Sequence, residues 1–180
     1  MLVGVTTWNL DQHDGTLTLL TGVTGRAARM GHRLTIAMDS WRISVTGDGD
    51  TPTSARLIVD VDSLRVLSGT GGLTPLTGPE KTLIRGNALK TLSAKRFPTI
   101  EFDAQTITAT DTGYRLAGPL TLHGVTRDIE VPVEVTDGRL SARATVSHKD
   151  FGIRPYSMAM GSMKVADEVV IEFSAALPAH

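Results

Sequence analysis

Cysteine is absent from the 180 residues, and aromatic side chains are scarce, at four Phe, two Trp and two Tyr. Without cysteine the chain forms no disulfide and offers no thiolate nucleophile or thiolate metal ligand. Basic residues are no more frequent than acidic ones, with 18 Lys and Arg against 19 Asp and Glu. Binding to a nucleic-acid backbone requires a basic surplus, so we expect no nucleic-acid partner.

Long apolar runs are also missing from the sequence. No stretch approaches the ~18 consecutive apolar residues of a membrane helix, so we expect no membrane span. The first residues show no basic segment followed by an apolar one, as a secretory leader would. On that basis we predict a cytoplasmic location.

The spacings typical of metal sites and catalytic sites are missing as well. The five histidines form no i, i+4 pair and no His-Glu-x-x-His motif, so we expect no metal and no cofactor. A site assembled from His32, His123 and His148 on different strands stays open as an alternative. Residues 147–150 contain the residue types of a Ser-His-Asp triad, but no Gly-x-Ser-x-Gly turn accompanies them. We therefore expect that the protein is not an enzyme.

Alternating apolar and polar residues recur along the chain and are bounded by turn-forming residues. Their hairpin spacing predicts about eight antiparallel strands. The alternating runs cover residues 16–22, 33–45, 55–61, 99–104, 114–122, 128–135, 139–147 and 167–175. We predict an all-β fold, a closed antiparallel barrel of about eight strands that forms a single domain over residues 1–180.

The alternation separates an inward, apolar face of these strands from an outward, polar face. The predicted inward residues are Leu57, Val59, Val61, Tyr114, Leu116, Gly118, Leu120, Leu122, Leu140, Ala142, Ala144, Val146, Val169, Ile171 and Phe173. The predicted outward residues are Arg56, Arg115, Arg139, Arg143 and Glu172. Within 33–45 the apolar phase shifts at Asp39 and Ser40, which predicts a bulge that bends the strand.

One segment has the periodicity of a helix. Thr77 and Glu80 have the spacing of a capping box, Pro79 lies in the first turn, and apolar residues follow at helical intervals. We predict one helix over about residues 78–92, in a long connection between strands.

Several inward residues are small, which favours an open interior. A barrel of about eight strands either fills with side chains or holds one ligand. Ala142, Ala144 and Gly118 add little volume, so a large ring placed at Gly118 is expected to project into the lumen. The methionines in 157–163 either form an adaptable wall against a flexible ligand or fold down as ordinary core.

Two motifs are the most specific in the chain: Leu-Thr-Leu-His-Gly-Val-Thr-Arg at 120–127 and Phe-Gly-Ile-Arg-Pro-Tyr-Ser at 151–157. Together with the segments 28–34, 63–76 and 97–104, they resemble the YceI-like family of lipid-binding proteins, in the form common in actinobacteria. The resemblance spans nearly the whole chain. It implies a lipocalin-like antiparallel β-barrel whose elongated apolar interior accommodates a polyisoprenoid, an isoprenoid quinone or a fatty-acid-like lipid. Members of the family are often exported.

We therefore expect a protein that binds, carries or sequesters a long-chain isoprenoid or other lipid without catalysis. An enzyme acting on a lipid through dispersed residues and a filled barrel acting as an interaction module stay open as alternatives, as does a homodimer. The predicted ligand-binding residues combine the wall of the barrel with polar groups and methionines near its mouth. They are Arg29, His32, Trp41, Leu116, Gly118, Leu120, Leu122, Arg154, Tyr156, Met158 and Met160.

Overall fold

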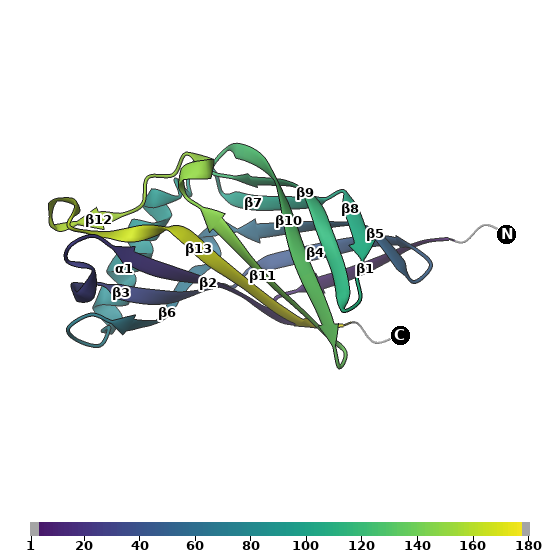
Figure 1. Ribbon diagram of the computed structural model, residues 1–180, viewed down its shortest axis with the longest axis horizontal. Helices are drawn as coiled ribbons and strands as arrows, with labels where there is room; N and C mark the ends of the chain where they lie inside the picture. Colours follow the sequence, from purple (N-terminus) through teal and green to yellow (C-terminus); the bar gives the residue numbers. More distant parts are fainter. Residues whose placement is uncertain (1–3, 178–180) are drawn as a thin grey trace.

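The computed structural model describes residues 4–177, which form an antiparallel sheet curled around an apolar interior (Figure 1). The strands are β1 (Val5–Asp11), β2 (Gly15–Thr24), β3 (His32–Met38), β4 (Trp41–Asp48), β5 (Thr51–Asp60), β6 (Leu64–Gly71), β7 (Thr99–Ala104), β8 (Thr106–Ala109), β9 (Gly113–Leu122), β10 (Val125–Thr136), β11 (Arg139–Ser147), β12 (Ser157–Met158) and β13 (Met163–Ala176). The α-helix α1 (Gly78–Thr91) connects β6 to β7. Short 3-10 turns are η1 (Ala28–Met30), η2 (Val61–Ser63), η3 (Lys149–Phe151) and η4 (Ala159–Gly161).

Neighbouring strands pair along one continuous path. Its order is β1-β4-β5-β7-β9-β10-β11-β13-β2-β3-β6, with β8 paired to β9 and β12 paired to β13 beside the path. Within residues 4–177, the end strands β1 and β6 do not pair with each other, so the sheet is a curled half-barrel of eleven strands. The predicted all-β antiparallel fold with one helix is confirmed, whereas the predicted closed barrel of eight strands is wrong.

The strand count differs because one predicted strand is split at a sharp corner and because β1 and β6 lie outside the predicted runs. The run 33–45 breaks at Asp39 and Ser40, the point where the apolar phase shifts, and its halves are β3 and β4. β3 pairs with β6, whereas β4 pairs with β5, and η2 makes the corresponding corner between β5 and β6. The backbone N–H of Asp39 donates to Ser63 O at 3.2 Å, and that of Asp60 donates to Ser40 O at 3.0 Å. These hydrogen bonds join the β3–β4 corner to the β5–β6 corner.

The inward face follows the predicted alternation closely. Every predicted inward residue except Val61 and Gly118 lines the interior, and Val61 is buried in η2 at 2% exposure. Two of the predicted outward arginines form ion pairs across neighbouring strands, Arg56 with Glu101 at 3.3 Å and Arg143 with Glu172. Such exposed ion pairs stabilise a fold by at most about 1 kcal/mol each. The apolar interior therefore provides most of the stabilisation.

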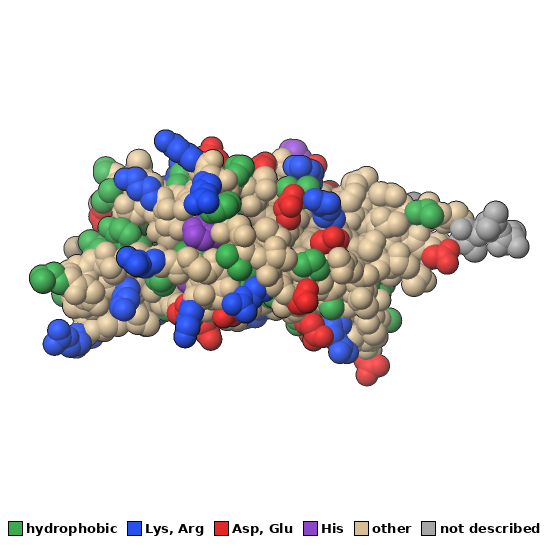
Figure 2. Space-filling view, turned by 90° about the horizontal axis from the view of Figure 1, so that it is seen from above, with side chains coloured by type: hydrophobic (Ala, Val, Ile, Leu, Met, Phe, Trp, Pro, Cys, Tyr) green, Lys and Arg blue, Asp and Glu red, His purple; other side chains and the backbone are tan. Residues whose placement is uncertain are grey.

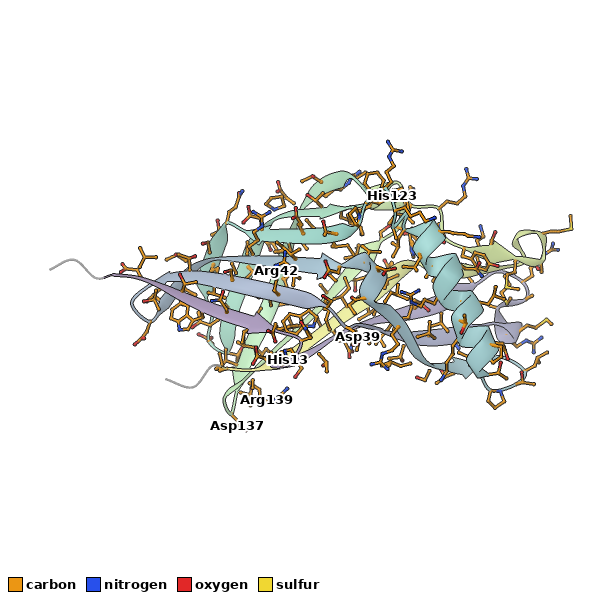
Figure 3. All side chains as sticks on the ribbon, turned by 180° about the vertical axis from the view of Figure 1, so that it is seen from behind. His13, Asp39, Arg42, His123, Asp137 and Arg139 are labelled. Carbon is orange, nitrogen blue, oxygen red and sulfur yellow. The ribbon has the colours of Figure 1, made fainter. Side chains whose placement is uncertain are left out.

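Helix α1 begins as predicted, with a complete capping box. The backbone N–H of Glu80 donates to Thr77 Oγ1 at 3.2 Å, and the backbone N–H of Thr77 donates to Glu80 Oε1 at 3.3 Å. Arg85 fixes the helix against the sheet, because its Nε donates to the Leu64 carbonyl at 2.8 Å. The helix lies against one end of the curled sheet (Figure 3). No helix in residues 4–177 is both long and apolar enough to cross a membrane.

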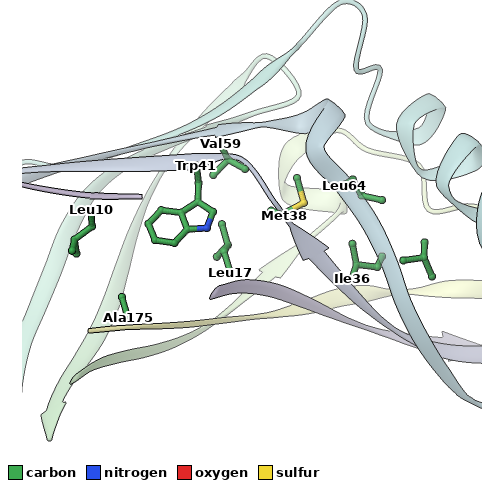
Figure 4. Close-up of a cluster of buried hydrophobic side chains, with 9 residues drawn as sticks. Leu10, Leu17, Ile36, Met38, Trp41, Val59, Leu64 and Ala175 are labelled. Atoms are coloured by element: carbon green, nitrogen blue, oxygen red, sulfur yellow. The ribbon is translucent and has the colours of Figure 1, made fainter. Parts of the chain in front are cut away.

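The interior is densely packed in two places. In the first, Trp41 is 2% exposed, and its ring meets the edge of Phe173 with 5.2 Å between ring centroids (Figure 4). Leu10, Leu17 and Met38 surround it. The second group contains Phe102, Ala104, Leu120, Val146, Phe151 and Ile153. The remaining space between the sheet and α1 is not filled by side chains.

Candidate functional site

An apolar cavity of about 910 Å³ runs through the interior of the half-barrel. This volume lies near the upper end of the range of about 300–1,000 Å³ that is typical of ligand pockets. The lining extends from Trp8 and Pro52, beside the β4–β5 hairpin, to Met30 and Met158, at the far end of the sheet. The cavity is therefore elongated.

Helix α1 supplies one side of the cavity wall. Glu80, Ile84, Ala88 and Leu92 line it and recur at intervals of four residues, which places them on one face of a helix. Leu83 adjoins this face and also lines the cavity, but remains 64% exposed. The helix thus separates the apolar interior from solvent over part of its length.

Three segments surround the mouth of the cavity: residues 24–33, 71–83 and 154–164, which we term the rim. The backbone N–H of Ala27 donates to Ser162 O at 2.8 Å, which joins the first segment to the third. His32 Nε2 donates to the Thr74 carbonyl at 2.6 Å, which joins the first segment to the second. Tyr156 lines the cavity and is still 38% exposed, so the cavity reaches the surface between these segments.

The structure brings six of the predicted ligand-binding residues together. His32, Leu116, Leu120, Leu122, Tyr156 and Met158 line the cavity. Three other predicted residues, Arg29, Arg154 and Met160, lie on the rim with exposed side chains that do not line the cavity. Met160 projects from η4 in a left-handed backbone conformation, with φ of 56°. The last two, Trp41 and Gly118, do not line the cavity and serve the packing of the fold.

Trp41 and Gly118 are corrections to the predicted site. The Trp41 side chain is enclosed by the first packed group and does not reach the cavity. Between the pairs Phe102–Leu120 and Thr106–Ala117, the β7–β8 segment has one residue more than the facing part of β9. The extra residue forms a bulge that brings Asp103 close to Gly118. A Cβ built at Gly118 would collide with the carbonyl oxygen of Asp103. Glycine therefore permits a close approach of two backbones here and does not enlarge the lumen.

Two of the three histidines of the alternative metal site serve local structure. The His32 ring holds Thr74, as described above, and His123 Nδ1 donates to the Phe151 carbonyl at 3.3 Å. The other nitrogen of His123 lies 3.2 Å from Ser93 Oγ, just after α1, so this ring connects three segments. Across residues 4–177, no group of three or more His, Cys, Asp or Glu side chains could hold a metal ion.

The run 147–150 forms a turn that is held by Asp167 of β13. The Asp167 carboxylate accepts hydrogen bonds from Ser147 Oγ and, at 2.9 Å, from the backbone N–H of Lys149. The backbone carbonyl of Asp167 accepts a third bond, from His148 Nδ1 at 2.7 Å. In the described chain, no hydrogen bond joins the Ser147 and His148 side chains, as a triad would require. The bond from Ser147, followed by that from Lys149, lowers the pKa of Asp167 below its ordinary value of 3.8.

This lowered pKa predicts a dependence of stability on pH. The carboxylate stabilises the fold at pH values above its unfolded pKa, and this contribution is lost as the pH falls through the lower, folded pKa. We expect Asp167→Asn to be less stable than the wild type at pH 7. The difference in stability between the two proteins should become smaller below about pH 4, where the wild-type carboxylate is being protonated. Urea unfolding at a series of pH values measures the difference. Two parallel pH profiles would contradict this role for Asp167.

Some cavity residues were not among the predicted ligand contacts. Trp8 of β1 and Leu19 of β2 line the cavity, and both belong to period-2 runs that could have indicated their inward direction. Lys164 also lines the mouth. No periodic signal marks it, because its position depends on how 154–164 folds back along the start of β13.

Comparisons with known proteins agree with this architecture. BcnA of Burkholderia cenocepacia has a similar structure, with a TM-score of 0.66 and 19% identity over 94% of this chain and 99% of that chain. A mutant YceI protein of Campylobacter jejuni has a TM-score of 0.55 and 15% identity over 80% and 85% of the two chains. No curated protein matches the sequence. The family model described as "YceI-like domain" matches residues 8–177, and the chain belongs to the YceI-like family.

Proposed function

We propose that the protein binds one long-chain apolar lipid in its cavity and carries or sequesters it without catalysis. The observation that supports this proposal is the elongated cavity of about 910 Å³, with its apolar lining and its mouth at the rim. Burial of hydrocarbon contributes about 0.8 kcal/mol per CH₂, so about a dozen buried carbons supply roughly 9–10 kcal/mol before the cost of ordering the chain. Such a ligand needs no chemistry from the protein. The cavity also weighs against a filled barrel that acts as an interaction module.

Membership of the YceI-like family favours an isoprenoid chain, either a polyisoprenoid or an isoprenoid quinone. The polar groups at the mouth suit the head group of such a lipid. His32 donates from Nε2 to Thr74, which leaves Nδ1 as the second ring nitrogen able to bond a hydroxyl. Lys164 and Tyr156 offer donors to a quinone oxygen or a phosphate. These side chains orient the head group, whereas the cavity provides the affinity.

Filling the cavity with a protein side chain tests the proposal. Ala144 of β11 lines the cavity and stands opposite Ile171 of β13. We expect Ala144→Trp to lower the affinity for a fluorescent isoprenoid or fatty-acid analogue at least about tenfold, because the indole occupies space needed by at least two CH₂ groups. The matched control is Thr145→Trp, which places the same ring on the exposed outer face of the strand.

Thermal unfolding of both variants is measured beside the titration with the fluorescent analogue. The proposal requires Ala144→Trp to stay folded and lose affinity, while Thr145→Trp keeps the affinity of the wild type. If folded Ala144→Trp binds the analogue as tightly as the wild type, the cavity is not the binding site.

A further inference from the structure

Exposed apolar side chains are concentrated on the rim. Residues 4–177 contain eight large hydrophobic residues that are exposed, and six of them belong to the rim. These six are Met30, Leu73, Leu83, Tyr156, Met158 and Met160. The Met160 side chain, at the tip of η4, is fully exposed. Apolar groups gathered in this way on a protein surface mark a site of interaction.

Basic side chains lie among these apolar ones. Five cations of the rim are exposed: Arg26, Arg29, Arg33, Arg154 and Lys164. Lys81 is a sixth cation of the rim, and Glu80 is the only acid in the three segments. The rim therefore has a formal charge of six minus one, or +5, whereas the net charge of the chain is -1. Glu80 accepts hydrogen bonds in the capping box of α1. None of the rim cations takes part in an ion pair within the described residues.

Five acidic side chains occupy hairpin turns away from the rim. Asp11 and Asp14 flank the β1–β2 turn, Asp48 and Asp50 lie at the β4–β5 turn, and Asp137 lies at the β10–β11 turn. Figure 3 shows Asp137 beside the β1–β2 turn and far from α1. In Figure 2, most of the blue side chains lie over the half of the molecule that carries the rim, with some red ones among them, and red ones are more frequent farther along the long axis. This distribution of charge favours an approach of the protein to a negatively charged surface with the rim in front.

We propose that the rim docks on the surface of an anionic lipid bilayer. Arginine and lysine side chains bind lipid phosphates, and methionine, leucine and tyrosine side chains enter the boundary between head groups and acyl chains. A second copy of the chain is a poor partner for the rim, because two rims carry charge of the same sign. The cavity opens between the docking segments, so a lipid passes between bilayer and cavity without crossing water. This transfer rests on the proposed function, whereas docking rests on the rim alone.

Vesicle sedimentation with the full chain tests docking. The vesicles contain either phosphatidylcholine alone or phosphatidylcholine with roughly one-third phosphatidylglycerol, an anionic lipid. We expect binding to the anionic vesicles only. The double variant Arg26→Glu with Arg33→Glu should lower this affinity at least about tenfold, because both residues contact the negative surface. Its matched control is Arg42→Glu with Arg115→Glu, which makes the same change of net charge on the outer face of the sheet.

The control should keep its affinity for the vesicles within about twofold, and Met160→Asp should lose affinity although its side chain supports no packing. Wild-type protein that ignores anionic vesicles would overturn the proposal, as would equal losses in the two double variants. A fluorescent fatty acid in vesicle-free solution separates docking from the proposed function. Binding of the fatty acid without vesicle binding refutes docking alone, whereas vesicle binding without fatty-acid binding refutes the proposed function and leaves docking supported.

Discussion

Gly118→Phe is expected to prevent the chain from folding. A Cβ at this position already collides with the backbone carbonyl of Asp103, so the aromatic ring has no free direction to take. Adding atoms to a well-packed interior usually costs about 1–3 kcal/mol, and here the opposing atom belongs to the backbone of a paired strand and cannot rotate away. We expect a cost above that range, seen as insoluble protein or as loss of the cooperative unfolding transition.

The neighbouring Ala117 provides a matched control for this substitution. Ala117 lies on the opposite face of β9, so Ala117→Phe places the same ring outside the interior. We expect this variant to fold and to unfold with a midpoint close to that of the wild type. The milder Gly118→Ala adds only the colliding methyl group and should still destabilise the protein. A stable Gly118→Phe protein would show that the bulge between β7 and β8 does not press on β9.

Trp41→Ala is expected to lower the free energy of unfolding by about 3–5 kcal/mol, the usual cost of truncating a buried Trp or Phe. The indole is 2% exposed and packs edge-on against Phe173, and both contacts are lost with it. Removal leaves a void among Leu10, Leu17 and Met38, which strand pairing prevents from collapsing. Chemical denaturation of the wild type and the variant measures this difference.

Trp8 is the matched control for Trp41. It has the same side chain, but it is half-buried and lines the cavity instead of the packed group. We expect Trp8→Ala to cost less than half as much stability, because part of its surface already faces open space. Equal losses at the two positions would contradict the distinction between a packed group and an open cavity.

Period-2 alternation predicts which face of a strand is buried, but it does not predict what lies opposite. Leu116 and Leu120 were assigned to the interior correctly, because burying one face of the sheet forces every second side chain inward. Gly118 shares their phase, yet it meets the bulge that contains Asp103. An isolated glycine in a strand is itself typical of a bulge or a close backbone approach. That signal, rather than small size, would have identified its role.

Closure of the sheet depends on long-range pairing and could not be predicted from local patterns. The shift in phase at Asp39 and Ser40 does predict a bend, but not that the strand changes partners there from β6 to β5. The rim could not be predicted from local patterns either, for a similar reason. Arg26, Leu73 and Lys164 are far apart in the sequence and have no shared periodicity, and only the folded chain brings their segments together.

Native mass spectrometry of the full chain, incubated with a long-chain isoprenyl phosphate and gently purified, tests the lipid-binding function most directly. We expect a complex of one lipid with one chain in the wild type and little or none in Ala144→Trp, whose indole occupies the cavity. Thr145→Trp should retain the complex. If the folded wild-type protein carries no lipid, or if Ala144→Trp carries as much as the wild type, the cavity does not hold a lipid.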